Sequence, residues 1–128
     1  MILVDSDVVI AHLRGVRAAE DWMARARREA GRLGTSVVTI AEVAGGMRGA
    51  ERREVARLLS SFRPFPVTER IAWRAAENMR KYRPSHSGIG LGDYLVAATA
   101  QIHGLELATL DIKHFPMFSG LRPPFNLT

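Results

Sequence analysis

The first ten residues, from Met1 to Ile10, constrain this chain more than any other stretch. An apolar run of Ile2, Leu3 and Val4 leads directly into the carboxylate of Asp5. A short run without polar alternation is typical of a strand that is buried on both faces, and so of a central strand in a parallel sheet. Ligands of such folds bind outside the carboxyl ends of the strands. Asp5 is therefore expected at the ligand-binding edge.

The rest of the chain alternates short apolar strands with longer amphipathic segments. We expect further strands at 35–38 and 105–109, an extended segment at 63–67, and helices at 6–13, 16–32, 39–47, 51–62, 68–82 and 93–103. Trp22, Ala30 and Trp73 are expected on buried helix faces. The alternation indicates a parallel α/β sandwich with right-handed crossovers, and 128 residues without repeats or linkers indicate a single domain covering 1–128.

The charge balance favours a polyanionic partner. The chain has 18 Lys and Arg residues against 13 Asp and Glu, a net charge of +5, which favours nucleic acid. It has no cysteine, so disulfides and thiolate metal sites are excluded. The chain has no apolar run long enough to cross a membrane and no signal-peptide pattern at its N-terminus, so we expect a cytoplasmic protein without membrane contact.

Four acids occupy equivalent positions around the expected sheet. Asp5 ends the first strand and Asp111 follows the strand at 105–109, whereas Glu42 and Asp93 lie near helix starts. The carboxyl ends of parallel strands and the starts of the following helices share one edge, so all four can face one crevice. Each also has a purely structural interpretation: Asp5, Ser6, Asp7 or Asp93 as a helix cap, Glu42 in a capping box with Thr39, and Asp111 as a turn residue.

Clustered carboxylates repel one another, and a divalent cation removes that conflict. Oxygen ligands suit Mg²⁺ or Mn²⁺, which can activate water and neutralise charge on a phosphoryl group. Zinc is disfavoured because the four histidines have no tight ligand spacing: His12, His86, His103 and His114.

In this order the motifs resemble those of PIN-domain ribonucleases, and more closely of VapC-type toxins from toxin–antitoxin pairs. The resemblance rests on four segments and runs from the first strand nearly to the C-terminus: residues 2–10, 36–43, 92–100 and 107–115. It implies a helix-rich, three-layer α/β/α sandwich around a short parallel sheet. It also implies metal-dependent endonucleolytic cleavage of cellular RNA (tRNA, rRNA or mRNA).

By resemblance, Asp5, Glu42, Asp93 and Asp111 are the family's acidic quartet, with Asp5, Asp93 and Asp111 as ligands of Mg²⁺ or Mn²⁺. Three further residues are implied as supporting groups: Ser6, Asp7 and Thr109. The resemblance further implies a homodimer and a VapB-type antitoxin, whose C-terminal segment lies in an apolar groove supplied by residues 39–62. The loop at 83–92 is a candidate for shaping the choice of target.

Arginines along residues 39–62 can contact acids of the antitoxin, the RNA backbone or only solvent: Arg48, Arg52, Arg53 and Arg57. Charge patterning does not separate these interpretations.

Two enzyme classes with a similar start lack required parts. A haloacid-dehalogenase-like phosphatase would use Asp5 as nucleophile and Asp7 as general acid. It also needs a lysine before its last acids, but Lys81 lies within a predicted helix and Lys113 follows Asp111. A receiver domain needs an aspartate at the end of a middle strand, and none lies between Asp21 and Asp93. A non-catalytic nucleic-acid-binding module explains the charge, yet leaves the converging acids to repel phosphate.

Overall fold

A four-stranded parallel sheet organises residues 1–127, the part of the chain that the computed structural model describes. In chain order the elements are β1 (Ile2–Val4), α1 (Ser6–Leu13), α2 (Arg17–Ala30), β2 (Gly34–Ser36), α3 (Val37–Gly45), the 3₁₀-helix η1 (Gly49–Glu51), α4 (Arg52–Ser60), β3 (Arg63–Phe65), α5 (Glu69–Tyr82), α6 (Leu91–His103), β4 (Glu106–Ala108) and the 3₁₀-helix η2 (Ile112–His114). The strand order is β3-β2-β1-β4, with every neighbouring pair parallel. The prediction that the first strand is interior is confirmed.

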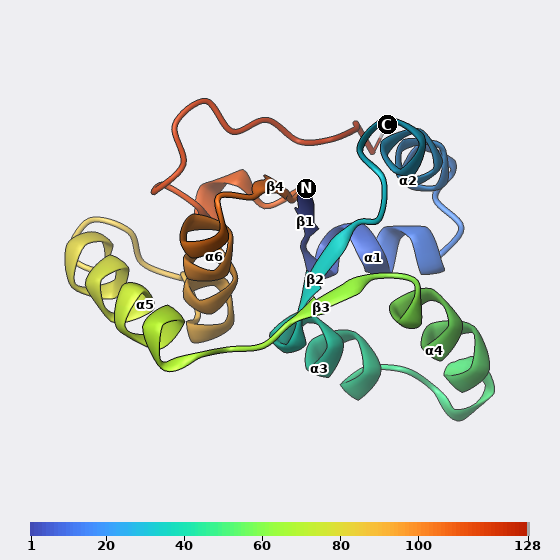
Figure 1. Ribbon diagram of the computed structural model, residues 1–128, viewed down its shortest axis with the longest axis horizontal. Coiled ribbons are helices and arrows are strands. Elements are labelled where there is room, and N and C mark those ends of the chain that lie inside the picture. Colours follow the sequence, from blue (N-terminus) through green and yellow to red (C-terminus); the bar gives the residue numbers. More distant parts are fainter. Residues whose placement is uncertain (128) are drawn as a thin grey trace.

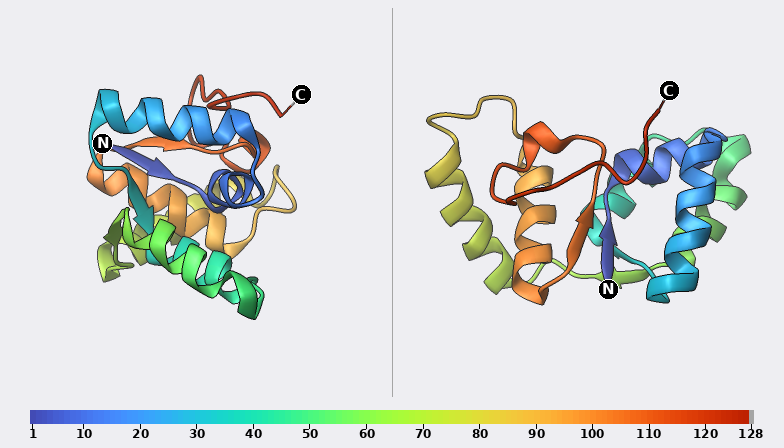
Figure 2. Two further views of the ribbon diagram at one scale, coloured as in Figure 1. Left: turned by 90° about the vertical axis from the view of Figure 1, so that its right-hand side faces the viewer. Right: turned by 90° about the horizontal axis from the view of Figure 1, so that it is seen from above.

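Helices cover both faces of this sheet. Helices α5 and α6 lie on one side of the strands, and α1 to α4 lie on the other (Figure 1 and Figure 2). The predicted helix-rich α/β/α sandwich is therefore confirmed. The segment expected only to be extended, at 63–67, contributes the outer strand β3, which pairs with β2 from Gly34 to Ser36.

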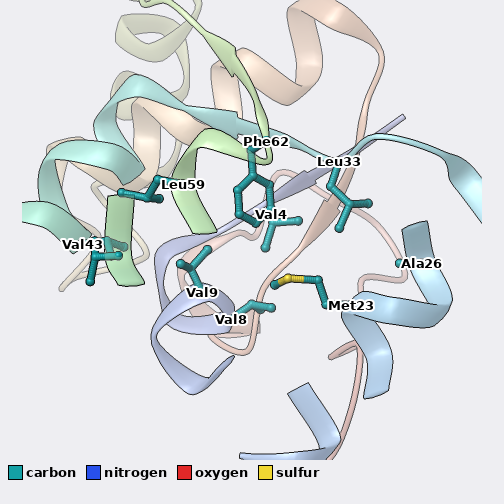
Figure 3. Packing of buried hydrophobic residues seen from close by; sticks show 10 residues of the cluster. Val4, Val8, Val9, Met23, Ala26, Leu33, Val43, Leu59 and Phe62 are labelled. Carbon is teal, nitrogen blue, oxygen red and sulfur yellow. The ribbon is translucent and has the colours of Figure 1, made fainter. Parts of the chain in front are cut away.

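Strand β1 divides the core between the two layers. Its successive side chains point to opposite faces, so Val4 packs with the cluster of α1 to α4, which includes Val8, Met23 and Phe62 (Figure 3). Leu3 packs instead with residues of α6 and β4. Burying one such aliphatic side chain contributes about 1.5–3 kcal/mol. Apolar packing on both faces of the sheet therefore fixes the position of β1 and of Asp5, the residue that follows it.

The second strand is shorter than predicted. Ser36 is the last residue of β2 and also the N-cap of α3, because its hydroxyl oxygen accepts the N–H of Val38 at 3.1 Å. Val37 and Val38 are helical despite their β propensity, since a serine cap provides a strong start signal. The interpretation of Thr39 and Glu42 as a capping box is therefore wrong.

Two expected core positions lie at the surface. Trp73 on α5 is 67% exposed and Ala30 at the end of α2 is also exposed. Helix α5 buries Ile71, Ala75 and Asn78, a stripe that leaves Trp73 on the solvent side. None of the helices in residues 1–127 is long and apolar enough to span a membrane.

Gly34 tests how tightly β2 and β3 pack. A Cβ atom there would lie 2.7 Å from Cε2 of Phe65, a buried side chain. We expect Gly34→Ala to lower the free energy of unfolding by about 1–3 kcal/mol, as overpacked cores do. Urea denaturation measures the change. Gly45→Ala is the matched control, because a Cβ at Gly45 meets nothing within 4 Å and should be neutral or stabilising. Equal effects at both positions would contradict the packing.

Candidate active site

Asp5 lies at the carboxyl end of β1, almost completely buried at 4% exposure. Its backbone N–H continues the sheet ladder to the carbonyl of Ala108 at 2.9 Å. One carboxylate oxygen accepts the N–H of Ser6 at 2.9 Å, which makes Asp5 the N-cap of α1. The other oxygen accepts the hydroxyl of Thr109 at 2.8 Å. Asp5, rather than Ser6 or Asp7, is thus the cap of α1, and it also joins the ends of β1 and β4.

Asp7 connects the start of α1 to the turn after β4. Its Oδ2 accepts the backbone N–H of Leu110 at 3.0 Å and lies 3.3 Å from the hydroxyl of Thr109. Its Oδ1 is buried and has no hydrogen-bond partner within residues 1–127. Asp7 therefore supports the site through the β4 turn and leaves one oxygen without a partner.

Glu42 reaches the same edge from the second turn of α3. Burial raises the pKa of its carboxylate, and the Asp93 and Asp7 charges and the Ser6 side chain are close enough to act on it as well. The side chain also lies against Gly92 at the start of α6, where a Cβ would be 3.4 Å from Oε2. The absence of a side chain at Gly92 therefore leaves room for Glu42.

Asp93 and Asp111 are joined by a histidine that the sequence analysis did not single out. Helix α6 begins at Leu91 with Gly90 as its cap, so Asp93 lies one turn in and accepts the N–H of Gly90 at 3.4 Å. Nδ1 of His114 lies 3.0 Å from Oδ2 of Asp93 and 2.8 Å from Oδ2 of Asp111. The interpretation of Asp93 as the cap residue itself is therefore wrong.

The acids share one electrostatic environment. Burial, followed by the charge of Asp7, raises the pKa of Asp5 to about 7, although hydrogen bonds from Thr109 and Ser6 oppose the shift. Burial also raises the pKa of Asp7, with a smaller contribution from Asp111, and the pKa of Glu42, with a contribution from Asp93. Negative charge is therefore disfavoured here unless a cation compensates for it.

The residues fit a hard divalent cation by their chemistry. The available donors are carboxylate oxygens, which suit Mg²⁺ or Mn²⁺, and one buried oxygen of Asp7 has no partner. Within the described part of the chain, no three Asp, Glu, His or Cys side chains are already grouped closely enough to hold an ion. Ion binding would therefore require the carboxylates to turn toward one another.

The structure thus brings the predicted residues to one edge of the sheet. Asp5, Asp7 and Glu42 interact with one another or with Asp93, and Asp111 is tied in through His114. Their assignments as metal ligands or catalytic groups stay predictions. The signal for His114 in the sequence is its position three residues after Asp111, on one face of a short helix.

The raised pKa of Asp5 predicts a pH-dependent stability of the metal-free protein. The folded state binds the Asp5 proton more tightly than the unfolded state, so stability should fall as pH rises from about 4 to about 7. At about 1.4 kcal/mol per pH unit, the full effect is on the order of 4 kcal/mol. Urea denaturation in EDTA measures it. Asp5→Asn should be more stable than wild type at pH 8 and lose this advantage near pH 4; a difference that does not change with pH would contradict the shift.

Comparison with known proteins identifies the family. A model of the PIN domain matches residues 2–117. Over 125 residues the chain is 66% identical to Ribonuclease VapC10 of Mycobacterium tuberculosis, covering 98% of this chain and 93% of the relative. It is 36% identical to Ribonuclease VapC19 of the same organism over 125 residues, covering 98% and 100%. The solved toxin–antitoxin complex from Klebsiella pneumoniae contains a chain with a TM-score of 0.79 and 28% identity, with 98% of both chains covered. The chain therefore belongs to the PIN domain family and, within it, to the VapC group.

Proposed function

We propose that this protein is an endoribonuclease toxin of a type II toxin–antitoxin pair, which acts on cellular RNA in the cytoplasm through a single PIN domain. The observation that carries the proposal is the meeting of Asp5, Glu42 and Asp93, from three separate segments, at one sheet edge where their charges interact. The 66% identity to a ribonuclease supports the same chemistry. Hydrolysis of a phosphodiester bond is the proposed reaction.

Each side chain of the site has a proposed task. Asp5, Asp93 and Asp111 hold Mg²⁺ or Mn²⁺, and Glu42 completes the acidic group. A bound ion of this kind supplies a water of lowered pKa and neutralises charge on the phosphoryl oxygens. Thr109 fixes the Asp5 carboxylate through its hydroxyl, whereas Ser6, whose side chain is close enough to act on the pKa of Glu42, is placed to orient that residue. Asp7 holds the β4 turn in register with α1.

The net charge of +5 and an arginine-rich segment support an RNA substrate. The side chains involved are exposed, one directly before η1 and three on α4: Arg48, Arg52, Arg53 and Arg57. Guanidinium groups bind phosphate through two parallel hydrogen bonds. The loop predicted at 83–92 ends at Gly90 in the structure, because α6 already begins at Leu91. It leads into α6 just before Asp93, where it is placed to shape target choice.

A groove of about 450 Å³ supports an antitoxin partner. Its apolar lining comes from α1, α3, α4 and the α3–η1 connection: Ile10, Leu13, Val43, Met47 and Val55. Arg14, Arg48 and Glu51 also line it, and Glu42 belongs both to this groove and to the acid site. A segment bound here would therefore lie beside Glu42, a position from which it can block the acid site. We propose a homodimer as the form that binds the antitoxin.

The central prediction is loss of cleavage in Asp5→Asn with the fold retained. Asparagine keeps the shape of Asp5 and can still cap α1, but it removes the charge that a divalent cation needs. We expect RNA cleavage in Mg²⁺ to fall by at least about 100-fold, a typical cost of a lost catalytic carboxylate. Gel analysis of a defined RNA measures the rate, and circular dichroism checks the fold.

Asp21→Asn is the matched control, since Asp21 is exposed on α2 and is not among the charges that act on Asp5, Asp7 or Glu42. It should cleave at the wild-type rate. Cleavage by Asp5→Asn at the wild-type rate would contradict the assignment of the site. RNA binding without any cleavage by the wild-type protein, unchanged in EDTA, would instead support a non-catalytic nucleic-acid-binding module.

Arginines at the groove test the antitoxin proposal separately. Arg14→Ala combined with Arg48→Ala should weaken binding of the antitoxin encoded beside this gene by roughly 3- to 30-fold at low salt, because each charge at the edge of an interface contributes up to about 1 kcal/mol. The difference should shrink at about 0.5 M NaCl, where exposed charges are screened. Titration calorimetry measures the affinity.

Arg80→Ala is the control for this pair, because Arg80 is exposed on α5, on the other side of the sheet. It should leave antitoxin binding unchanged. Unchanged antitoxin binding by the double variant, together with slower RNA cleavage, would contradict the groove as the antitoxin site and assign these arginines to RNA.

A further inference from the structure

His114 occupies the space between two acids that come from different parts of the chain. Its Nδ1 is 2.8 Å from Oδ2 of Asp111 on the same short turn and 3.0 Å from Oδ2 of Asp93 on α6. Both the imidazolium and the Nδ1–H tautomer of neutral imidazole carry a proton on this nitrogen. One N–H can therefore be shared between the two carboxylates in either protonation state.

The Asp111 carboxylate depends on this contact for its position. The backbone of Asp111 is held, since its N–H donates to the Thr109 hydroxyl oxygen at 3.1 Å. Its side chain is 45% exposed, and within residues 1–127 its carboxylate contacts Nδ1 of His114. Without that contact the side chain would be free to sample other rotamers in solvent.

The imidazole itself is held by the core. The next residue, Phe115, is 1% exposed and packs with Val96 and Ala97 of α6. This packing docks η2 against the helix that carries Asp93. The buried Phe115 thus holds the neighbouring His114 in place. A flexible ion pair on the surface would not hold its partner in one position.

We propose that His114 is a positioning residue that fixes the Asp111 carboxylate beside Asp93 and thereby decides whether Asp111 joins the acid site. Its effect on metal binding rests on the proposed function, whereas its effect on Asp111 does not. Groups that orient metal ligands change affinity by about 10- to 100-fold when they are removed. Because the Asp111 side chain is so exposed, Asp111 needs an orienting group beside it before it can serve as a metal ligand.

Mn²⁺ binding, measured by titration calorimetry, tests the proposal. His114→Ala should weaken Mn²⁺ affinity on the order of 10-fold. His114→Asn should recover most of that loss, because the asparagine amide can place an N–H near the position of Nδ1. His103→Ala is the control: His103 ends α6, ten residues after Asp93, and its ring packs against Phe65 with a centroid separation of 4.8 Å. It should bind Mn²⁺ like wild type.

A double-mutant cycle with Asp111→Asn separates positioning from a general structural effect. If His114 acts through Asp111, His114→Ala should cause no further loss of Mn²⁺ affinity once Asp111 is Asn. An equal loss in both backgrounds would overturn the proposal, as would the absence of any rescue by His114→Asn.

A measurement on the metal-free protein keeps the two claims distinct. ¹⁵N relaxation should show greater motion of the Asp111 and Ile112 amides in His114→Ala than in wild type, and wild-type motion in His103→Ala. Unchanged motion would overturn the positioning role. If the wild-type protein bound no Mn²⁺ but His114→Ala still increased the motion of the Asp111 and Ile112 amides, the metal site of the proposed function would be contradicted. The positioning role of His114 would remain intact.

Discussion

The buried hydrogen bond between Asp5 and Thr109 is the interaction on which the site depends. It joins the residue after β1 to the residue after β4 at 2.8 Å, and both residues are buried. Asp5 also caps α1, and Thr109 also accepts the N–H of Asp111. Two strands, one helix and the final turn therefore meet at a single carboxylate. A change in any of them moves the same group.

A carboxylate in this position is unfavourable for the folded protein by itself. Burial and neighbouring acids raise the pKa of Asp5 to about 7, so the charged form destabilises the metal-free fold near neutral pH. The apolar side chains on either side, Leu3 and Val4 before it and Val8 and Val9 after it, are completely buried. The packing of these side chains outweighs the unfavourable free energy of burying the Asp5 carboxylate and keeps Asp5 in its buried position. Such conflict between fold and charge is typical of functional sites.

The sequence predicted the sheet, the helices and the convergence of the acids because each depends on strong, local patterns. Apolar runs such as Ile2 to Val4 define buried strands, and a carboxylate directly after a strand in a parallel sheet has one available edge. The start of α3 was missed because Val37 and Val38 have strand propensity, whereas the Ser36 cap places them in a helix. Trp73 was misplaced because size and hydrophobicity do not determine which side of α5 faces the core.

The contact of His114 with Asp93 could not be predicted from the sequence, for a different reason. Its partner Asp93 lies 21 positions away on another element, and the two meet because Phe115 docks η2 onto α6. Tertiary packing of this kind leaves no periodic signal. The groove was expected from residues 39–62, whereas its lining by Ile10 and Leu13 of α1 and its connection to the acids through Glu42 depend on the same kind of tertiary packing.

Anomalous diffraction from a crystal of the protein soaked in Mn²⁺ tests the central claim most directly, namely that Asp5 anchors a divalent-cation site completed by distant segments. We expect a single strong anomalous peak at the carboxyl edge of the sheet, within about 2.0–2.4 Å of carboxylate oxygens from Asp5 and Asp93, the range for Mg²⁺-like and slightly larger cations. A peak elsewhere on the molecule, or none at millimolar Mn²⁺ at pH 8, would contradict it.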